Sequence, residues 1–168
     1  MISRNLRHFR LILAVADLGS LTRASEVCHV SQPAVTQAIS KIEREVGGAI
    51  FERTRNGFFL TPRGEVLAAR FRRAFERLDP ALADVSPRLR LTVSHAQLQA
   101  LIAVREAENF TLAARQLGLA QPTVHRAITQ IEEEAGRKLF ERASYGIVPT
   151  RACQALAQAA RLALYELD

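Results

Sequence analysis

Residues 31–43 read SQPAVTQAISKIE, and residues 120–132 read AQPTVHRAITQIE. The second stretch follows the first at an offset of 89 residues. When residues 6–79 are laid on residues 95–168 at that offset, no gap is needed and 24 of the 74 aligned pairs are identical. Identity sustained at one fixed offset is the signature of a duplicated structural unit. The sequence therefore predicts two tandem copies of one small domain.

The first copy begins with the pattern of three short helices. Apolar residues at helical spacing predict a helix over 6–18 that ends at Gly19. Ser20 is expected to cap a second helix, and Ser31 to cap a third helix with Pro33 in its first turn. The expected core faces are Leu6, Phe9, Leu13 and Ala16 on the first helix, Leu21, Ala24 and Val27 on the second, and Val35, Ala38, Ile39 and Ile42 on the third.

A hairpin and a longer helix complete the unit. Two short β-favouring runs within residues 50–60 flank Asn56-Gly57, a dipeptide that suits a tight turn with positive φ at both positions. A helix with a wide apolar stripe is predicted over 62–79. This order of elements is typical of a winged helix-turn-helix domain, which places one helix in the major groove of DNA.

The predicted fold class is mainly α, with two tandem winged helix-turn-helix domains, each with a short β-hairpin wing and a C-terminal linker helix. The first domain and its linker helix cover residues 1–79. A connector over 80–94 contains Pro80 and Pro87, and the diverged second domain covers 95–168.

The first copy also resembles a known family. Its residues 20–68 contain the motifs SxTxAxxxxxVSQPAxTxxIxxxE, GxxxFxR and LTPRG. In these motifs the segment resembles the N-terminal DNA-binding domain of LysR-type bacterial transcriptional regulators. The resemblance implies sequence-specific binding of double-stranded DNA, with residues 31–44 as the recognition helix. It also implies a linker helix that pairs with its counterpart in a dimer.

The resemblance carries over to individual positions of the first copy. It implies that Gln32, Pro33, Thr36 and Gln37 face base edges, that Thr22 and Ser31 contact phosphate, and that Arg53 and Arg55 form the wing contacts. Helical periodicity places Ser40 and Lys41 on the exposed side of the same helix. Glutamine suits a bidentate contact to adenine, and helix N-termini suit phosphates. Alternatives stay open: Pro33 also serves the helix start, Arg53 is also a candidate for an ion pair inside the domain, and Lys41 for a solvated face.

The second copy retains the core pattern but differs on its surface. Its expected core is Leu98, Leu101, Ala113, Leu117, Val124, Ala127, Ile128, Ile131, Leu139 and Phe140, and its candidate DNA-binding residues are Thr111, Gln121, Thr123, His125, Arg126, Thr129 and Arg142. Ala120 replaces the capping Ser31, and Ser144 replaces the wing residue Arg55. Arg126 has the geometry to contact guanine. The second copy therefore either reads a different half-site or acts as a packing partner.

Charge supports a polyanionic partner, chiefly for the first copy. The chain has a formal net charge of +6 and a sequence pI of about 10.3. Residues 1–88 contain 14 basic and 9 acidic residues, whereas residues 89–168 contain 9 and 8. Because phosphate contacts dominate the affinity for DNA, we expect the first copy to be dominant. The runner-up interpretation is a protein-interaction scaffold built from winged helices.

Other classes of function lack support in the sequence. The histidines do not align between the copies, so we expect no enzyme, metal site or cofactor. Cys28 and Cys153 do not correspond either, and both are expected to be unpaired, buried thiols. No apolar run approaches the ~20 residues of a membrane helix, which favours a cytoplasmic protein.

Self-association through the linker helices is expected, as an intrachain pseudo-dimer or a homodimer. A small-molecule effector is expected only if a C-terminal domain exists beyond these residues.

Overall fold

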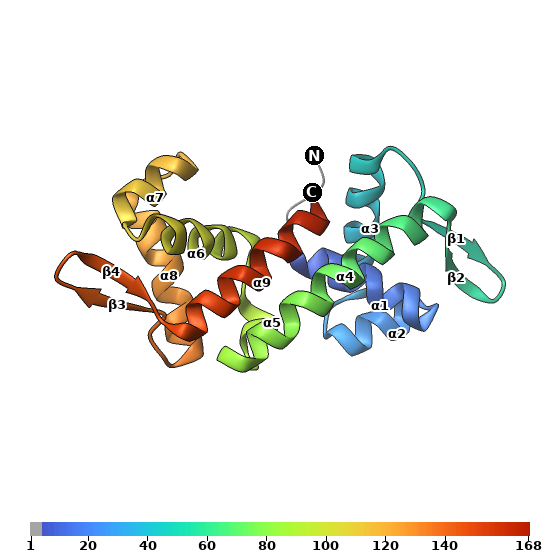
Figure 1. Cartoon of the computed structure of the whole chain (residues 1–168). Helices are drawn as coiled ribbons and strands as arrows, with labels where there is room; N and C mark the ends of the chain where they lie inside the picture. The colour runs from blue at the N-terminus through green and yellow to red at the C-terminus, as the bar shows by residue number, and fades with distance from the viewer. Residues whose placement is uncertain (1–4) are drawn as a thin grey trace. The chain divides into compact units, whose positions relative to one another are not determined.

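The computed structural model describes residues 5–168, and its elements confirm the predicted fold class (Figure 1). The helices are α1 (Leu6–Leu18), α2 (Leu21–Cys28), α3 (Gln32–Val46), α4 (Pro62–Val85), α5 (Leu89–Thr92), α6 (His95–Ala107), α7 (Phe110–Leu117), α8 (Gln121–Ala135) and α9 (Arg151–Leu167). The strands are β1 (Phe51–Thr54), β2 (Gly57–Leu60), β3 (Phe140–Ala143) and β4 (Gly146–Pro149). Within the described residues, no helix is long and apolar enough to cross a membrane.

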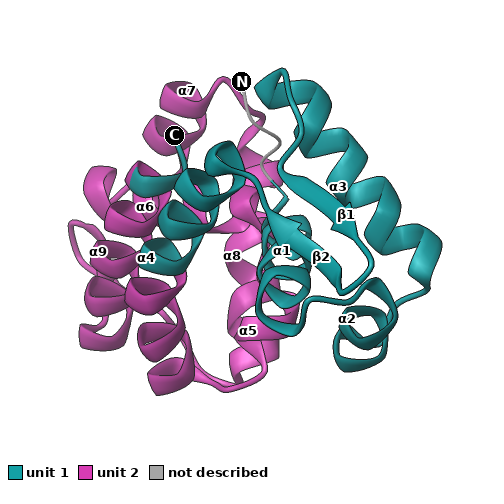
Figure 2. Ribbon diagram, turned by 90° about the vertical axis from the view of Figure 1, so that its right-hand side faces the viewer, with its two compact units in different colours: residues 1–74, 166–168 teal, residues 75–165 magenta. Residues whose placement is uncertain are grey.

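The chain divides into two compact units (Figure 2). The first unit holds the described residues up to Ala74 together with 166–168, and the second holds 75–165. Each contains one run of three helices followed by an antiparallel two-stranded hairpin: α1–α3 with β1–β2, and α6–α8 with β3–β4. The second unit also holds the end of α4 and the short helix α5. The two units therefore repeat one order of elements.

In the first unit, the predicted helix ends are confirmed by hydrogen bonds. The Ser20 hydroxyl accepts from the Arg23 N–H at 3.2 Å, and the Ser31 hydroxyl accepts from the Ala34 N–H at 3.2 Å. Gly19 ends α1 in the left-handed conformation with φ of 66°. Gly residues adopt this conformation without the steric cost of a Cβ.

The core of the first unit is partly the predicted one. Leu6, Phe9, Ala24 and all four predicted residues of α3 are buried. Leu13 and Ala16 are only half-buried, and Leu11, Ile12 and Val15 take the inward side of α1 instead. The Phe9 and Phe71 rings stack at 4.4 Å, which joins α1 to α4 within this unit.

The prediction of a buried Val27 is wrong, since 64% of this residue is exposed. The short helix α2 turns Ala24 and Ser25 inward. Ser25 is tolerated there because its hydroxyl donates to the Thr22 carbonyl at 2.7 Å.

The predicted hairpin is present, but its turn differs from the prediction. Thr54 pairs with Gly57, so Arg55 and Asn56 form the two-residue loop. Asn56 does not have a positive φ, whereas Gly57 does, at 125°. A Cβ on Gly57 would lie 2.3 Å from the Gly19 carbonyl oxygen, so glycine is required by a close approach of two backbones.

The first linker helix extends beyond its predicted end at Asp79. Helix α4 continues through Pro80 to Val85. Proline removes one N–H donor from a helix, which normally favours termination. Here Leu78, Leu82 and Val85 are all buried at helical spacing, and their burial offsets that loss.

The second unit repeats the same local structure with different caps. All predicted core residues are buried except Leu117 and Ala127, which are half-buried. Ala120 precedes α8 with no side-chain cap, as the sequence predicts. The thiols of Cys28 and Cys153 are free, but only Cys153 is fully buried. Burial raises the pKa of Cys153 to about 12.

One ion pair recurs at equivalent positions in the two units. Arg72 Nη2 lies 2.8 Å from Asp17 Oδ1, and Arg161 Nη1 lies 3.0 Å from Glu106 Oε1. Each pair joins the helix after the hairpin to the first helix of the same unit. These two arginines therefore have a structural partner.

We expect exchanging the two N-cap residues to change the stability of the two domains in opposite directions. Ser31→Ala should lower the free energy of unfolding of the first domain by about 1 kcal/mol, because the Ala34 N–H loses its acceptor. Ala120→Ser should stabilise the second domain by a similar amount, since φ and ψ of Ala120 (−72°, 143°) nearly match those of Ser31 (−73°, 153°).

Native-state hydrogen exchange of amides in α3 and α8 measures the two domains separately. A destabilisation by both substitutions would contradict the assignment of position 120 as a vacant cap.

Candidate nucleic-acid interface

Helix α3, the predicted recognition helix, has one buried and one exposed face. Val35, Ala38, Ile39 and Ile42 are buried, which fixes the rotation of the helix about its axis. The exposed face therefore presents the predicted residues together: Gln32, Pro33, Thr36, Gln37, Ser40 and Lys41 are all exposed, as is the capping residue Ser31. Thr22 is also exposed, near the start of α2.

A half-buried carboxylate joins α3 to the wing. Glu43 Oε2 accepts a hydrogen bond from the Ile50 N–H at 2.8 Å, just before β1. In the second unit, Glu132 Oε2 accepts from the Leu139 N–H at the same distance. A charged acceptor makes such a bond stronger than a neutral one. Sequence comparison showed these glutamates to be identical but did not reveal this role.

Two of the three carboxylates in the acidic run 132–134 have partners within the second unit. Glu132 is engaged with Leu139, and Glu134 Oε2 lies 3.4 Å from Arg88 Nε. Only Glu133 of the three is exposed. The run therefore weakens the electrostatic support for DNA binding less than its sequence suggests.

A second contact missed by the sequence analysis stabilises the end of α3. The Arg63 guanidinium of the LTPRG motif donates to the Val46 carbonyl oxygen, which has no partner within the helix. Gly48 leaves room for it, because a Cβ there would lie 2.8 Å from Arg63 Nη1. In the second copy both residues change together, to Ala152 and Arg137.

The first wing holds two exposed arginines, Arg53 on β1 and Arg55 in the turn. The Arg53 guanidinium lies 5.6 Å from the centre of the Phe58 ring on the opposite strand. Within residues 5–168 it forms no ion pair with an acidic side chain, so the intradomain ion pair considered above is not observed. Both guanidinium groups are accessible to an anion.

The first wing is also attached to the helix-turn-helix. The Phe58 N–H donates to the Gly19 carbonyl oxygen at 3.1 Å. The Phe58 ring meets Phe51 edge to face, with centroids 6.3 Å apart. We call this group of contacts the wing latch (Gly19, Gly57, Phe58).

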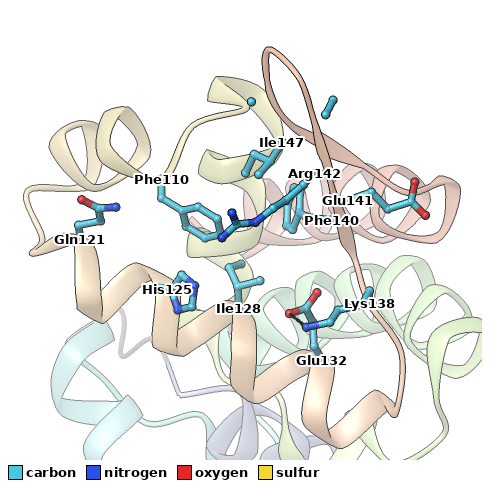
Figure 3. Close-up of a pocket in the computed structure, with 12 residues that line it drawn as sticks. Phe110, Gln121, His125, Ile128, Glu132, Lys138, Phe140, Glu141, Arg142 and Ile147 are labelled. Carbon is cyan, nitrogen blue, oxygen red and sulfur yellow. Dashed lines mark ion pairs between the residues drawn. The ribbon is translucent and has the colours of Figure 1, made fainter.

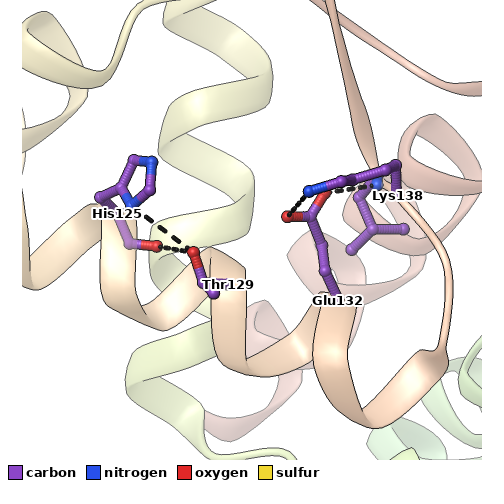
Figure 4. A network of polar contacts seen from close by, with 5 residues as sticks. His125, Thr129, Glu132 and Lys138 are labelled. Atoms are coloured by element: carbon purple, nitrogen blue, oxygen red, sulfur yellow. Dashed lines mark hydrogen bonds and ion pairs between the residues drawn. The ribbon is translucent and has the colours of Figure 1, made fainter.

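The corresponding face of the second unit is exposed but chemically different. Thr111, Gln121, Thr123, His125, Arg126 and Arg142 are exposed, and Thr129 is half-buried. Thr111 Oγ1 donates to Gln121 Oε1 at 3.1 Å. Thr129 Oγ1 donates to the His125 carbonyl at 2.9 Å and lies 3.5 Å from His125 Nδ1 (Figure 4). The Phe110 ring lies 5.0 Å from the His125 ring, so the imidazole is held from two sides.

We expect Glu43→Ala to destabilise the first domain. The substitution leaves the Ile50 N–H without an acceptor, which should lower the free energy of unfolding by about 1–3 kcal/mol. Glu52→Ala is the matched control, because Glu52 carries the same charge on the exposed side of β1. Chemical denaturation monitored by circular dichroism measures the free energy of unfolding of both variants. Equal decreases would show that the lost negative charge, and not the hydrogen bond, causes the effect.

Comparison with known proteins identifies the family. A model described as "Bacterial regulatory helix-turn-helix protein, lysR family" matches residues 6–65 and, a second time, residues 95–154. The HTH-type transcriptional regulator GalR of Pseudomonas putida is 37% identical over 166 residues, which cover 97% of this chain and 42% of GalR. The transcriptional activator protein LysR of Escherichia coli is 37% identical over 79 residues, covering 47% of this chain and 25% of that protein.

Among solved structures, the crystal structure of a BenM_DBD/catB site 1 DNA complex has 36% identity and a TM-score of 0.43, with 45% of this chain and 85% of that chain covered. The alignment with GalR runs through both copies, although this chain spans less than half of GalR. These relatives are transcriptional regulators. This chain belongs to the lysR family of bacterial regulatory helix-turn-helix proteins and carries the family's DNA-binding domain twice.

Proposed function

We propose that this chain is a sequence-specific transcriptional regulator that reads double-stranded DNA with both domains, 1–79 and 95–168, joined by the connector 80–94. The observation that carries the proposal is the joint exposure of the polar face of α3 and of two wing arginines on one domain. The first domain supplies most of the affinity, because residues 1–88 carry a net charge of +5 and residues 89–168 a net charge of +1.

In the first domain, Gln32, Thr36 and Gln37 read bases. The Thr36 hydroxyl donates to the Gln32 carbonyl at 3.2 Å, which leaves the Thr36 methyl group for contact with a thymine methyl. Glutamine side chains suit adenine. Pro33, Ser40 and Lys41 lie on the same exposed face and complete the contact surface.

Contacts to the DNA backbone set the position of the first domain. The helix N-terminal regions supply two of these contacts, from Thr22 and Ser31. The wing supplies the other two, from Arg53 and Arg55. Free N–H groups at a helix start attract phosphate, and wing guanidinium groups bind it without reading sequence. Ser31 combines this role with capping of α3.

The second domain reads a different half-site. Gln121 Oε1 is occupied by Thr111, so the Gln121 amide is left as a hydrogen-bond donor. His125 and Arg126 replace Thr36 and Gln37, and arginine suits guanine. Thr123 and Thr129 flank this pair, and Arg142 together with Thr111 contacts the backbone.

The linker helices provide the dimer-like arrangement within one chain. Residues 166–168 of the α9 end belong to the first unit, where Arg73 Nε donates to Glu166 Oε2 at 3.2 Å. Leu156, Ala160, Ala163, Leu164 and Leu167 form a buried stripe on α9. An intrachain pseudo-dimer would use such apolar linker helices to hold two non-identical recognition helices. A homodimer is the alternative arrangement.

Selection of bound sites from a random DNA library of about 40 base pairs tests the two-headed model. We expect two different half-sites at a fixed spacing. The double substitution Thr36→His with Gln37→Arg should convert the first half-site toward the second, because it copies the second recognition surface. A perfect palindrome selected by the wild-type chain would contradict the intrachain arrangement, and absence of enrichment would favour the scaffold interpretation.

Salt dependence tests the proposed phosphate contacts of the first wing. Arg53→Ala and Arg55→Ala should each lower the slope of log K against log salt by about 1, because each removes one phosphate contact. Arg72→Ala is the control, since Arg72 pairs with Asp17. Electrophoretic mobility shift titrations between about 50 and 200 mM salt measure the slopes. Equal slopes for all three variants would refute the assigned wing contacts.

A further inference from the structure

The two wings differ in their attachment to the helix-turn-helix. In the first unit, the Phe58 N–H reaches the Gly19 carbonyl oxygen at 3.1 Å. In the second unit, Ile147 corresponds to Phe58 and Glu108 corresponds to Gly19. Within the described residues, the Ile147 N–H forms no hydrogen bond with the Glu108 carbonyl oxygen. A Cβ on Gly146 would lie 3.5 Å from the Glu108 carbonyl oxygen, against 2.3 Å for Gly57 and Gly19. The second wing therefore stands farther from its helix-turn-helix.

A pocket lies between α8 and the hairpin β3–β4. The pocket has a volume of about 940 Å³ and lies entirely within the second unit (Figure 3). Ligand pockets commonly have volumes of roughly 300–1,000 Å³ and mostly apolar walls with a few polar groups. Phe110, Ile128, Phe140 and Ile147 form the apolar walls. The Phe110 and Phe140 rings are 6.4 Å apart and meet edge to face.

The polar groups of the pocket favour an anion. Figure 3 shows the Arg142 side chain extending across the pocket toward Phe110, whereas Glu141 points away. Within residues 5–168 Arg142 forms no ion pair. Glu132 is occupied by the Leu139 N–H and has Lys138 Nζ at 4.0 Å, so its charge is already compensated. The Arg142 guanidinium is therefore the cation of the pocket that has no acidic partner among the described residues, and it lies beside the apolar walls.

We propose that the second domain binds a small, planar aromatic carboxylate in this pocket. The ring would lie between Phe110, Phe140 and Ile147, and the carboxylate would pair with Arg142. A guanidinium matches a carboxylate in a bidentate geometry, and aromatic walls suit a flat apolar body. In the first unit the bulkier Phe58 takes the place of Ile147 and is held in the wing latch.

The ligand would regulate DNA binding by the second domain, and this consequence rests on the proposed function. Gln121, His125 and Arg142 line the pocket and also belong to the proposed DNA surface. Ligand and DNA therefore compete for the same side chains. The second half-site should lose affinity in the presence of ligand, while the first half-site is unaffected.

Binding is tested first without DNA, so that its failure is distinguishable from failure of the proposed function. The probe is 2-naphthoate, titrated into the full chain and followed by amide chemical shifts. We expect shifts at Phe110, His125 and Ile147 and a dissociation constant on the order of 0.1–1 mM, as befits a fragment-sized ligand. No shifts at Thr36 or Phe58, the corresponding first-unit positions, are expected.

Two variants and two further probes control the test. Ile147→Phe copies the first wing and should weaken binding at least about tenfold by filling the pocket, whereas Arg142→Gln should weaken it through loss of the charge. The neutral alcohol 2-naphthylmethanol should bind more weakly than 2-naphthoate, and inorganic phosphate should not reproduce the shifts. Unchanged affinity in both variants would overturn the proposal, as would equal shifts in the two units.

Discussion

The hydrogen bond from a wing-proximal N–H to the carboxylate of the recognition helix is the constraint on which each domain depends. Glu43 with Ile50 and Glu132 with Leu139 use the same separation along the chain and the same distance of 2.8 Å. The bond joins the C-terminal part of the recognition helix to the start of the wing. Together with the buried face of the helix, it sets where the exposed side chains lie. The surface can therefore change while the geometry that presents it persists.

Around this shared framework the two domains have diverged in a consistent direction. The first retains the Ser31 cap, the Arg63 contact to the Val46 carbonyl and the wing latch. The second has Ala120, Ala152 and Glu108 at the corresponding positions. Each change removes a local polar contact and leaves the apolar core in place. The second domain thus keeps its fold, while its wing lacks the latch bond and its exposed surface has different side chains.

In the proposed function, the chain has two non-equivalent DNA-binding domains. The first domain combines exposed amide and hydroxyl groups on α3 with two accessible arginines on its wing. The second combines His125 and Arg126 with a pocket under its wing. A duplicated regulator with identical heads would be limited to symmetric sites. Divergence of one head permits an asymmetric site and, in our proposal, a ligand response built into the DNA-binding domain itself.

The sequence by itself determined the duplication, the fold class, the helix caps and the exposed face of α3, because periodicity and capping are local properties. It also predicted the candidate DNA-binding residues of the second copy, which the structure shows to be exposed except for the half-buried Thr129. Only the tertiary structure decided the exposure of Val27, the continuation of α4 through Pro80, the use of Glu43 and Glu132 as internal acceptors, and the wing latch of one domain alone. These features depend on distances between residues that are separate in sequence, and hydropathy spacing does not encode such distances.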